Sequence, residues 1–138
     1  MGKKSISIEQ ATAWTKTYQS NMRSGSAKAF LMSCDAIVDI LKEMKVLQDD
    51  GKGNFTLNNV EDSSIRGYLA INPDQTEANG ETMVLVGTKK DASGVERDMV
   101  KGEKDAPFKE SDLDGSGCFD FSLPCPRHCD KNSPLNHG

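Results

Sequence analysis

The hydrophobic pattern is clearest at residues 81–88, where four apolar residues, Met83 to Val86, follow one another between polar flanks. This run is far too short to span a membrane. Its β-branched residues, with Gly87 at the end, are typical of a strand rather than of a helical turn. We therefore expect a buried central strand here, and the other elements are placed relative to it.

A helical pattern lies near the N-terminus. Ser7 stands three residues before Gln10, which is the spacing of a capping box. Apolar positions then recur on one side of a helix, at Ile8, Ala11, Trp14, Thr15, Tyr18 and Met22. The pattern predicts a helix from Ser7 to the 24–26 segment, with Trp14 and Tyr18 in the core rather than in a ligand site.

A second helix is predicted over residues 27–45. Its main apolar stripe consists of Ala27, Phe30, Leu31, Cys34, Ile37, Val38, Leu41 and Met44. Cys34 falls in the middle of this stripe, so we expect a buried and unreactive thiol. Met32, Ala36 and Ile40 lie off the stripe and form a second apolar side, which suggests contact with another element or another copy of the chain.

The strand pattern continues on both sides of the central run. Residues 65–71 alternate, with Ile65, Gly67, Leu69 and Ile71 on one face, and the 72–80 turn segment ends in Asn-Gly. A turn at 90–94 leads to a strand at 95–100, residues 55–57 form a short strand, and residues 118–123 can add another.

These elements predict an α+β fold. We expect two N-terminal helices packed on an antiparallel meander of three to five strands. The expected organisation is a single domain, residues 1–123, followed by a Cys/Pro-rich tail, residues 124–138.

Three short motifs carry a family resemblance: Ile65-Arg66-x-Tyr68, Leu85-Val86-Gly87 and Pro124-Cys125-Pro126. Together with their order, they resemble a group of short uncharacterised proteins of Bacteroidota, from Phe30 to the C-terminus. The shared residues are mainly structural, and the resemblance implies no activity.

The tail holds most of the candidate chemistry. Together with Cys118, which precedes it, the tail gathers three thiols and both histidines of the chain, which are candidate metal ligands: Cys118, Cys125, His128, Cys129 and His137. Zinc takes four such ligands in a tetrahedron, but the spacing C-x6-C-x3-C lacks a paired C-x2-C. Three alternatives stay open: a zinc site, thiols that are free or packed on the domain, and a Cys125–Cys129 disulfide if the protein leaves the cytoplasm.

Composition narrows the function classes. The net charge is −4, and the only basic clusters are 3–4 and 89–90, so a nucleic-acid partner is not expected. The N-terminal residues turn polar without an apolar signal-peptide segment, which predicts a cytoplasmic location. There, thiols or metal ligands are expected before disulfides.

The sequence contains no recognisable catalytic constellation. The 112–117 segment resembles a calcium loop, but counting from Asp112 puts Leu123 where a bidentate Glu is required. We expect a non-enzymatic interaction or self-assembly module that binds itself or another protein, without a membrane partner and without a cofactor other than the possible zinc. A zinc-stabilised binding domain is the alternative, and an enzyme of another class ranks last.

Overall fold

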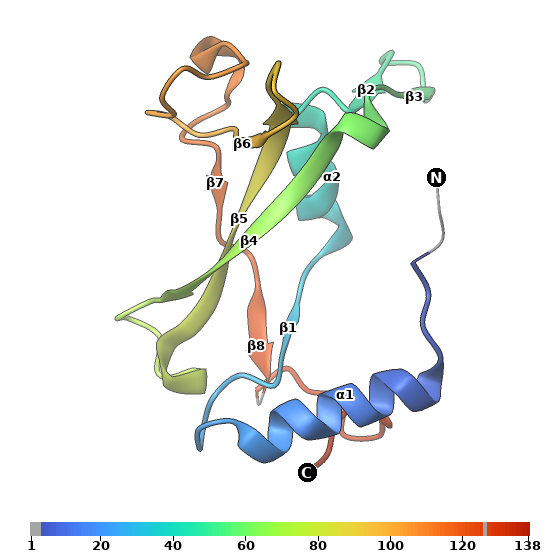
Figure 1. Ribbon diagram of the computed structural model, residues 1–138, viewed down its shortest axis with the longest axis vertical. Coiled ribbons are helices and arrows are strands. Elements are labelled where there is room, and N and C mark those ends of the chain that lie inside the picture. The colour runs from blue at the N-terminus through green and yellow to red at the C-terminus, as the bar shows by residue number, and fades with distance from the viewer. Residues whose placement is uncertain (1–3, 126) are drawn as a thin grey trace. The chain divides into compact units, whose positions relative to one another are not determined.

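The computed structural model describes residues 4–125 and 127–138 and confirms a mixed α+β fold (Figure 1). The chain divides into two compact units made of discontinuous segments. Unit 1 comprises Met1–Leu31, Ala70–Thr82 and Ser122–Gly138, and unit 2 comprises Met32–Leu69 and Met83–Phe121. Within the described residues, no helix is long and apolar enough to cross a membrane.

Unit 1 contains helix α1 (Ile8–Asn21), strands β1 (Ala29–Leu31) and β8 (Leu123–Cys125), and the short 3-10 helix η2 (Glu77–Gly80). The predicted start of α1 is confirmed, because the Ser7 side chain accepts a hydrogen bond from the Gln10 amide. Strands β1 and β8 pair antiparallel, with Phe30 opposite Pro124. The residue expected to begin the tail, Pro124, therefore lies inside a strand.

The prediction that Trp14 and Tyr18 belong to the core is wrong. They are 59% and 55% exposed, and no residue of α1 is buried. The helix is held instead by polar contacts with the C-terminal segment. Thr15 Oγ1 lies 3.0 Å from His137 Nε2, and Gln19 exchanges hydrogen bonds with the Leu135 carbonyl and the His137 amide at 2.9 and 2.8 Å. An amphipathic stripe shows that a helix is one-sided, but not what covers it.

The interior of unit 1 is made of small and polar residues. Its buried side chains include Ser26, Ala27, Ala78, Thr82, Ser122 and Cys125. The Glu81 carboxylate accepts hydrogen bonds from Ser26 Oγ and the Ala27 amide at 3.0 and 2.7 Å. Hydrogen bonds therefore contribute much of the stabilisation that apolar packing provides in a larger core.

Unit 2 is built around a sheet. Strands β4 (Ser63–Ile71) and β6 (Glu96–Asp98) both pair with β5 (Glu81–Lys90), and β7 (Cys118–Phe119) also pairs with β5. The central strand expected at 81–88 is thus confirmed as β5, and its first two residues, like the last two of β4, belong to unit 1.

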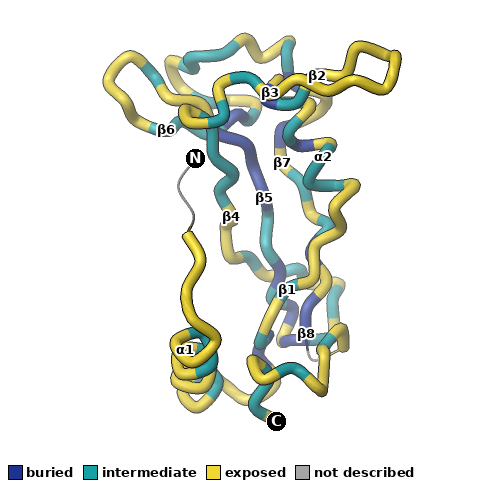
Figure 2. Tube along the Cα trace, turned by 90° about the vertical axis from the view of Figure 1, so that its right-hand side faces the viewer, coloured by how far each residue is buried: buried dark blue, intermediate teal, exposed yellow. Residues whose placement is uncertain are grey.

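Helix α2 (Cys34–Glu43), the hairpin of β2 (Leu47–Asp49) and β3 (Phe55–Leu57), and the short helices η1 (Val60–Asp62) and η3 (Glu110–Asp112) complete unit 2. Its buried apolar residues are Ile40, Val46, Leu85, Val86, Met99 and Leu113. Figure 2 shows that β5 is the most continuously buried strand.

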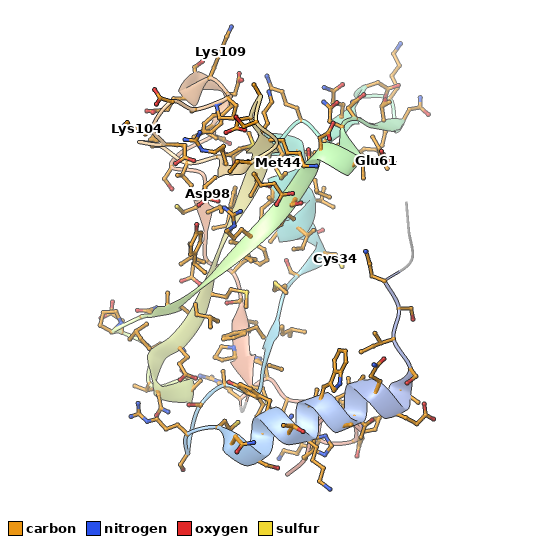
Figure 3. All side chains as sticks on the ribbon, in the orientation of Figure 1. Cys34, Met44, Glu61, Asp98, Lys104 and Lys109 are labelled. Carbon is orange, nitrogen blue, oxygen red and sulfur yellow. A yellow bond between two sulfur atoms is a disulfide. The ribbon has the colours of Figure 1, made fainter. Side chains whose placement is uncertain are left out.

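The second predicted helix is wrong in its first part. Residues 29–31 form β1, and the helix begins only at Cys34, after Ser33, whose side chain accepts a hydrogen bond from the Ala36 amide at 3.1 Å. Cys34 is consequently exposed in the first turn, not buried (Figure 3). Ile40, expected on a second apolar side in contact with another element or another copy, is 0% exposed within the single chain, so its cover does not require another copy.

Candidate functional site

Strand β4 forms an open edge of the sheet in unit 2. It pairs with β5 and has no other strand partner among the residues that the structure describes. Proteins usually protect such an edge with Lys, Pro or a very short strand. The nine residues of β4 contain neither Lys nor Pro.

The face of β4 expected to be buried is covered only in its first part. A side chain at Gly67 would meet Met83 Sδ at 2.6 Å and Leu85 at 3.2 Å, so this part of the face lies against the β5 side chains. Leu69, two residues further on, is 80% exposed. The burial of residues 65–71 does not alternate, because Gly67 is exposed and Leu69 and Ile71 are 80% and 66% exposed, so the predicted buried face is wrong beyond Ile65. The absence of Lys and Pro from this strand was visible in the sequence as the signal of an unprotected edge.

The backbone groups of β4 alternate between the sheet and the open edge. The Ser64 carbonyl accepts a hydrogen bond from Thr88 Oγ1 on β5 at 3.1 Å, so the backbone of Ser64 faces the sheet. Because successive residues of a strand point their N–H and C=O groups to opposite sides, those of Ile65, Gly67 and Leu69 face the open edge. They form a row of donors and acceptors available to another strand.

A polar cluster links β4 to β6, the two strands that lie on opposite sides of β5. Asp98 on β6 accepts hydrogen bonds from the Arg66 guanidinium and the Tyr68 hydroxyl, both on β4. Arg66 also donates to the Glu96 carbonyl at 3.3 Å, and Ser64 Oγ donates to the Glu96 carboxylate at 3.1 Å. Asp98, the last residue of β6, is labelled in Figure 3. These bonds hold the edge strand in a defined position.

Electrostatics in this cluster keep both β4 side chains protonated. The hydrogen bond to Asp98 is the main cause that raises the pKa of Tyr68. Hydrogen bonding with Tyr68, together with the Asp98 charge, raises the pKa of Arg66. A phenol with a raised pKa and a permanent cation are poor general bases, so neither Tyr68 nor Arg66 is suited to accept a proton.

The five candidate metal ligands do not come together. Cys125 and Cys129 form a disulfide, with their Cα atoms 4.8 Å apart, which is the third of the alternatives expected for this pair. Cys118 belongs to unit 2 and is an exposed thiol. His137 is engaged by Thr15 and Gln19, and His128 is exposed. In the described parts of the chain, no three His, Cys, Asp or Glu residues form a group that could hold a metal.

No protein-family model, curated protein or solved structure matches this chain. Function is therefore inferred from the chain's own residues and geometry.

Proposed function

We propose that the protein is a non-enzymatic self-assembly module in which the β4 edges of two copies pair antiparallel. The observation that carries this proposal is a nine-residue edge strand with outward-facing backbone groups and an 80% exposed Leu69. A long edge strand without Lys or Pro is a template for pairing with another chain.

The strand is suited to pairing with itself. Gly67 is the middle residue of Ser63–Ile71. A twofold axis at Gly67 lets the two copies of this residue exchange both of their hydrogen bonds, because its backbone groups face the open edge. The full length of β4 then overlaps its counterpart.

This register also matches the side chains. It sets Ile65 opposite Leu69 of the other copy, so that two apolar side chains cover each other. On the other face it sets Arg66 opposite Tyr68 of the other copy, where a guanidinium and an aromatic ring attract by about 0.5–1 kcal/mol when exposed. Like charges do not meet in any of these pairs.

Light scattering coupled to size-exclusion chromatography tests the proposal at micromolar concentration. The wild-type protein is expected to approach twice its chain mass of 15.0 kDa. Leu69→Lys should yield the monomer, because a charged edge residue opposes strand pairing. Trp14→Lys is the matched control, since it places the same charge at a 59% exposed apolar residue on α1.

Two results would contradict the edge model. One is a wild-type mass of 15.0 kDa at every concentration. The other is dissociation by Trp14→Lys with Leu69→Lys still dimeric, which would move the interface to α1. Circular dichroism confirms that both variants are folded.

The disulfide supports a proposal about location. Disulfides persist mainly in oxidising compartments and are rare in the cytoplasm. The Cys125–Cys129 bond therefore favours an oxidising compartment over the cytoplasmic location expected from the N-terminal residues. Mass spectrometry of the protein alkylated immediately on lysis tests this, and free Cys125 and Cys129 thiols in that sample would refute it.

A further inference from the structure

Unit 2 contains a cleft that is separate from the β4 edge. It encloses about 750 Å³ between the C-terminal end of α2, the end of β5 and the loop that carries Phe108. A second hollow of about 550 Å³ shares Lys45, Lys89, Phe108 and Asp112 with it. We call the two hollows together the lysine cleft. Their volumes are in the range of small-molecule sites.

The acidic residues of the lysine cleft already have partners. Asp112 lies 3.2 Å from Lys45 Nζ, and Asp62 lies 3.8 Å from Lys90 Nζ. Asp91 accepts hydrogen bonds from two amides of its own turn and pairs with Arg97. Glu43 accepts a hydrogen bond from the Asp114 amide, and burial raises its pKa. Ion pairs with lysine or arginine therefore offset the charges of the other three carboxylates, Asp62, Asp91 and Asp112.

Two cations of the cleft lack such partners. The structure shows no ion pair for Lys89 or Lys109 within the residues it describes. Lys89 stands opposite Arg97 in the β5–β6 ladder, and like charges at such positions are destabilising. Arg97 is itself neutralised by Asp91 and Glu103, at 3.4 and 3.2 Å. An anion beside Lys89 would supply the missing counter-charge.

Lys45 contributes a second observation. It follows the end of α2 with a φ of 61°, a left-handed conformation that glycine usually supplies at this position. The conformation is unfavourable for a long side chain, and residues of this kind cluster at functional sites. Here it accompanies a side chain that lines both hollows.

Phe108 gives the cleft an apolar component. It lines both hollows and is partly buried. Met44 and Met99 line the larger hollow only, and they are partly buried and buried, respectively. Figure 3 shows Lys109 on the outer loop next to Phe108 in sequence, with its side chain directed to solvent. A flexible lysine in this position can reach a ligand that enters over the ring.

We propose that the lysine cleft binds a small phosphate monoester that carries a flat ring. The phosphate would contact the ammonium groups of Lys89 and Lys109, beside the ion pair of Lys45 with Asp112, and the ring would lie on Phe108. Ser63 is the only residue lining the lysine cleft that belongs to β4. This proposal therefore does not depend on self-assembly through β4.

Titration followed by amide NMR tests the proposal, with phenyl phosphate as the probe. Inorganic phosphate and phenol supply the two halves of the probe separately. Phenyl phosphate should shift the Lys89, Phe108 and Lys109 signals at lower concentration than either half. Lys89→Gln should weaken binding about tenfold or more, the effect of losing one charged hydrogen bond. Lys52→Gln, at an exposed loop lysine, is the matched control and should leave the affinity unchanged.

Each other outcome would overturn the proposal. If phenol bound as tightly as phenyl phosphate, the cleft would bind the ring alone, without a contribution from the phosphate. Equal weakening by Lys89→Gln and Lys52→Gln would show non-specific attraction to lysines. No shift of cleft signals at millimolar phenyl phosphate would show that the cleft does not take this class of ligand.

Discussion

The Met44 side chain occupies the space in front of Gly87 that any side chain at that position would need. Met44 ends α2 and Gly87 lies in the buried part of β5, so this contact seats the helix on the sheet of unit 2 (Figure 3). The absence of a Cβ at residue 87 is what allows the close approach.

Gly87→Ala should therefore destabilise unit 2 by about 1–3 kcal/mol, the usual cost of forcing extra atoms into a packed interior. Chemical denaturation measures the loss. Adding Met44→Ala should restore part of it, because the shortened side chain vacates the space. If the two substitutions are simply additive, the contact is not the cause.

Leu85→Ala should cost about 2–5 kcal/mol of unfolding free energy, through lost transfer energy and a residual cavity. Leu85 is 4% exposed at the centre of β5. Leu69→Ala, the same change at an exposed site, should stay within about 0.5 kcal/mol in the dissociated protein. A loss below about 1 kcal/mol at Leu85 would mean that β5 is not the core strand.

Thiol labelling should follow exposure. Cys34 and Cys118 are exposed free thiols, so an alkylating reagent should modify both in the native protein. Cys125 and Cys129 should react only after reduction, because they form the disulfide. This order reverses the one expected from the sequence, where Cys34 was placed in the core. Peptide mapping by mass spectrometry decides between them.

Acidification should weaken the turn after β5. The pKa of Asp91 lies below its ordinary value of 3.8, chiefly because its carboxylate accepts the Val95 amide, and also through Arg97. A lowered folded-state pKa stabilises the protein above the unfolded value, and this stability is lost as pH falls through the folded value. Asp91→Asn should therefore show a smaller loss of stability below about pH 4 than the wild type. Identical curves for the two proteins would contradict this.

Local signals predicted the elements that depend on local sequence. The Ser7 and Gln10 spacing located the start of α1, and the apolar run from Met83 to Val86 located β5. The Asn-Gly and 90–94 turns were enough to place strands on both sides of β5.

Non-local pairing explains the main errors. The apolar stripe continued through residues 27–33, so nothing local separated β1 from α2, and β1 is defined by pairing with β8 at the other end of the chain. Ser33 has no Glu or Gln three residues later, so the capping-box signal was missing. The open edge of β4 could be identified only from the strand order. The sequence pattern of residues 65–71 does not show which of their side chains are covered by other parts of the chain.

The bond between Thr15 and His137 joins residues 122 positions apart. At the usual 5–20 residues per second, a ribosome adds the second of them roughly 6–25 s after the first. Strands β5 and β6 pair residues only a few positions apart and can form during that interval. Helix α1 cannot gain its contacts with the C-terminal segment until translation reaches that segment. A chain cut before Leu135 should therefore leave α1 without its hydrogen-bonded neighbours, however well unit 2 has folded.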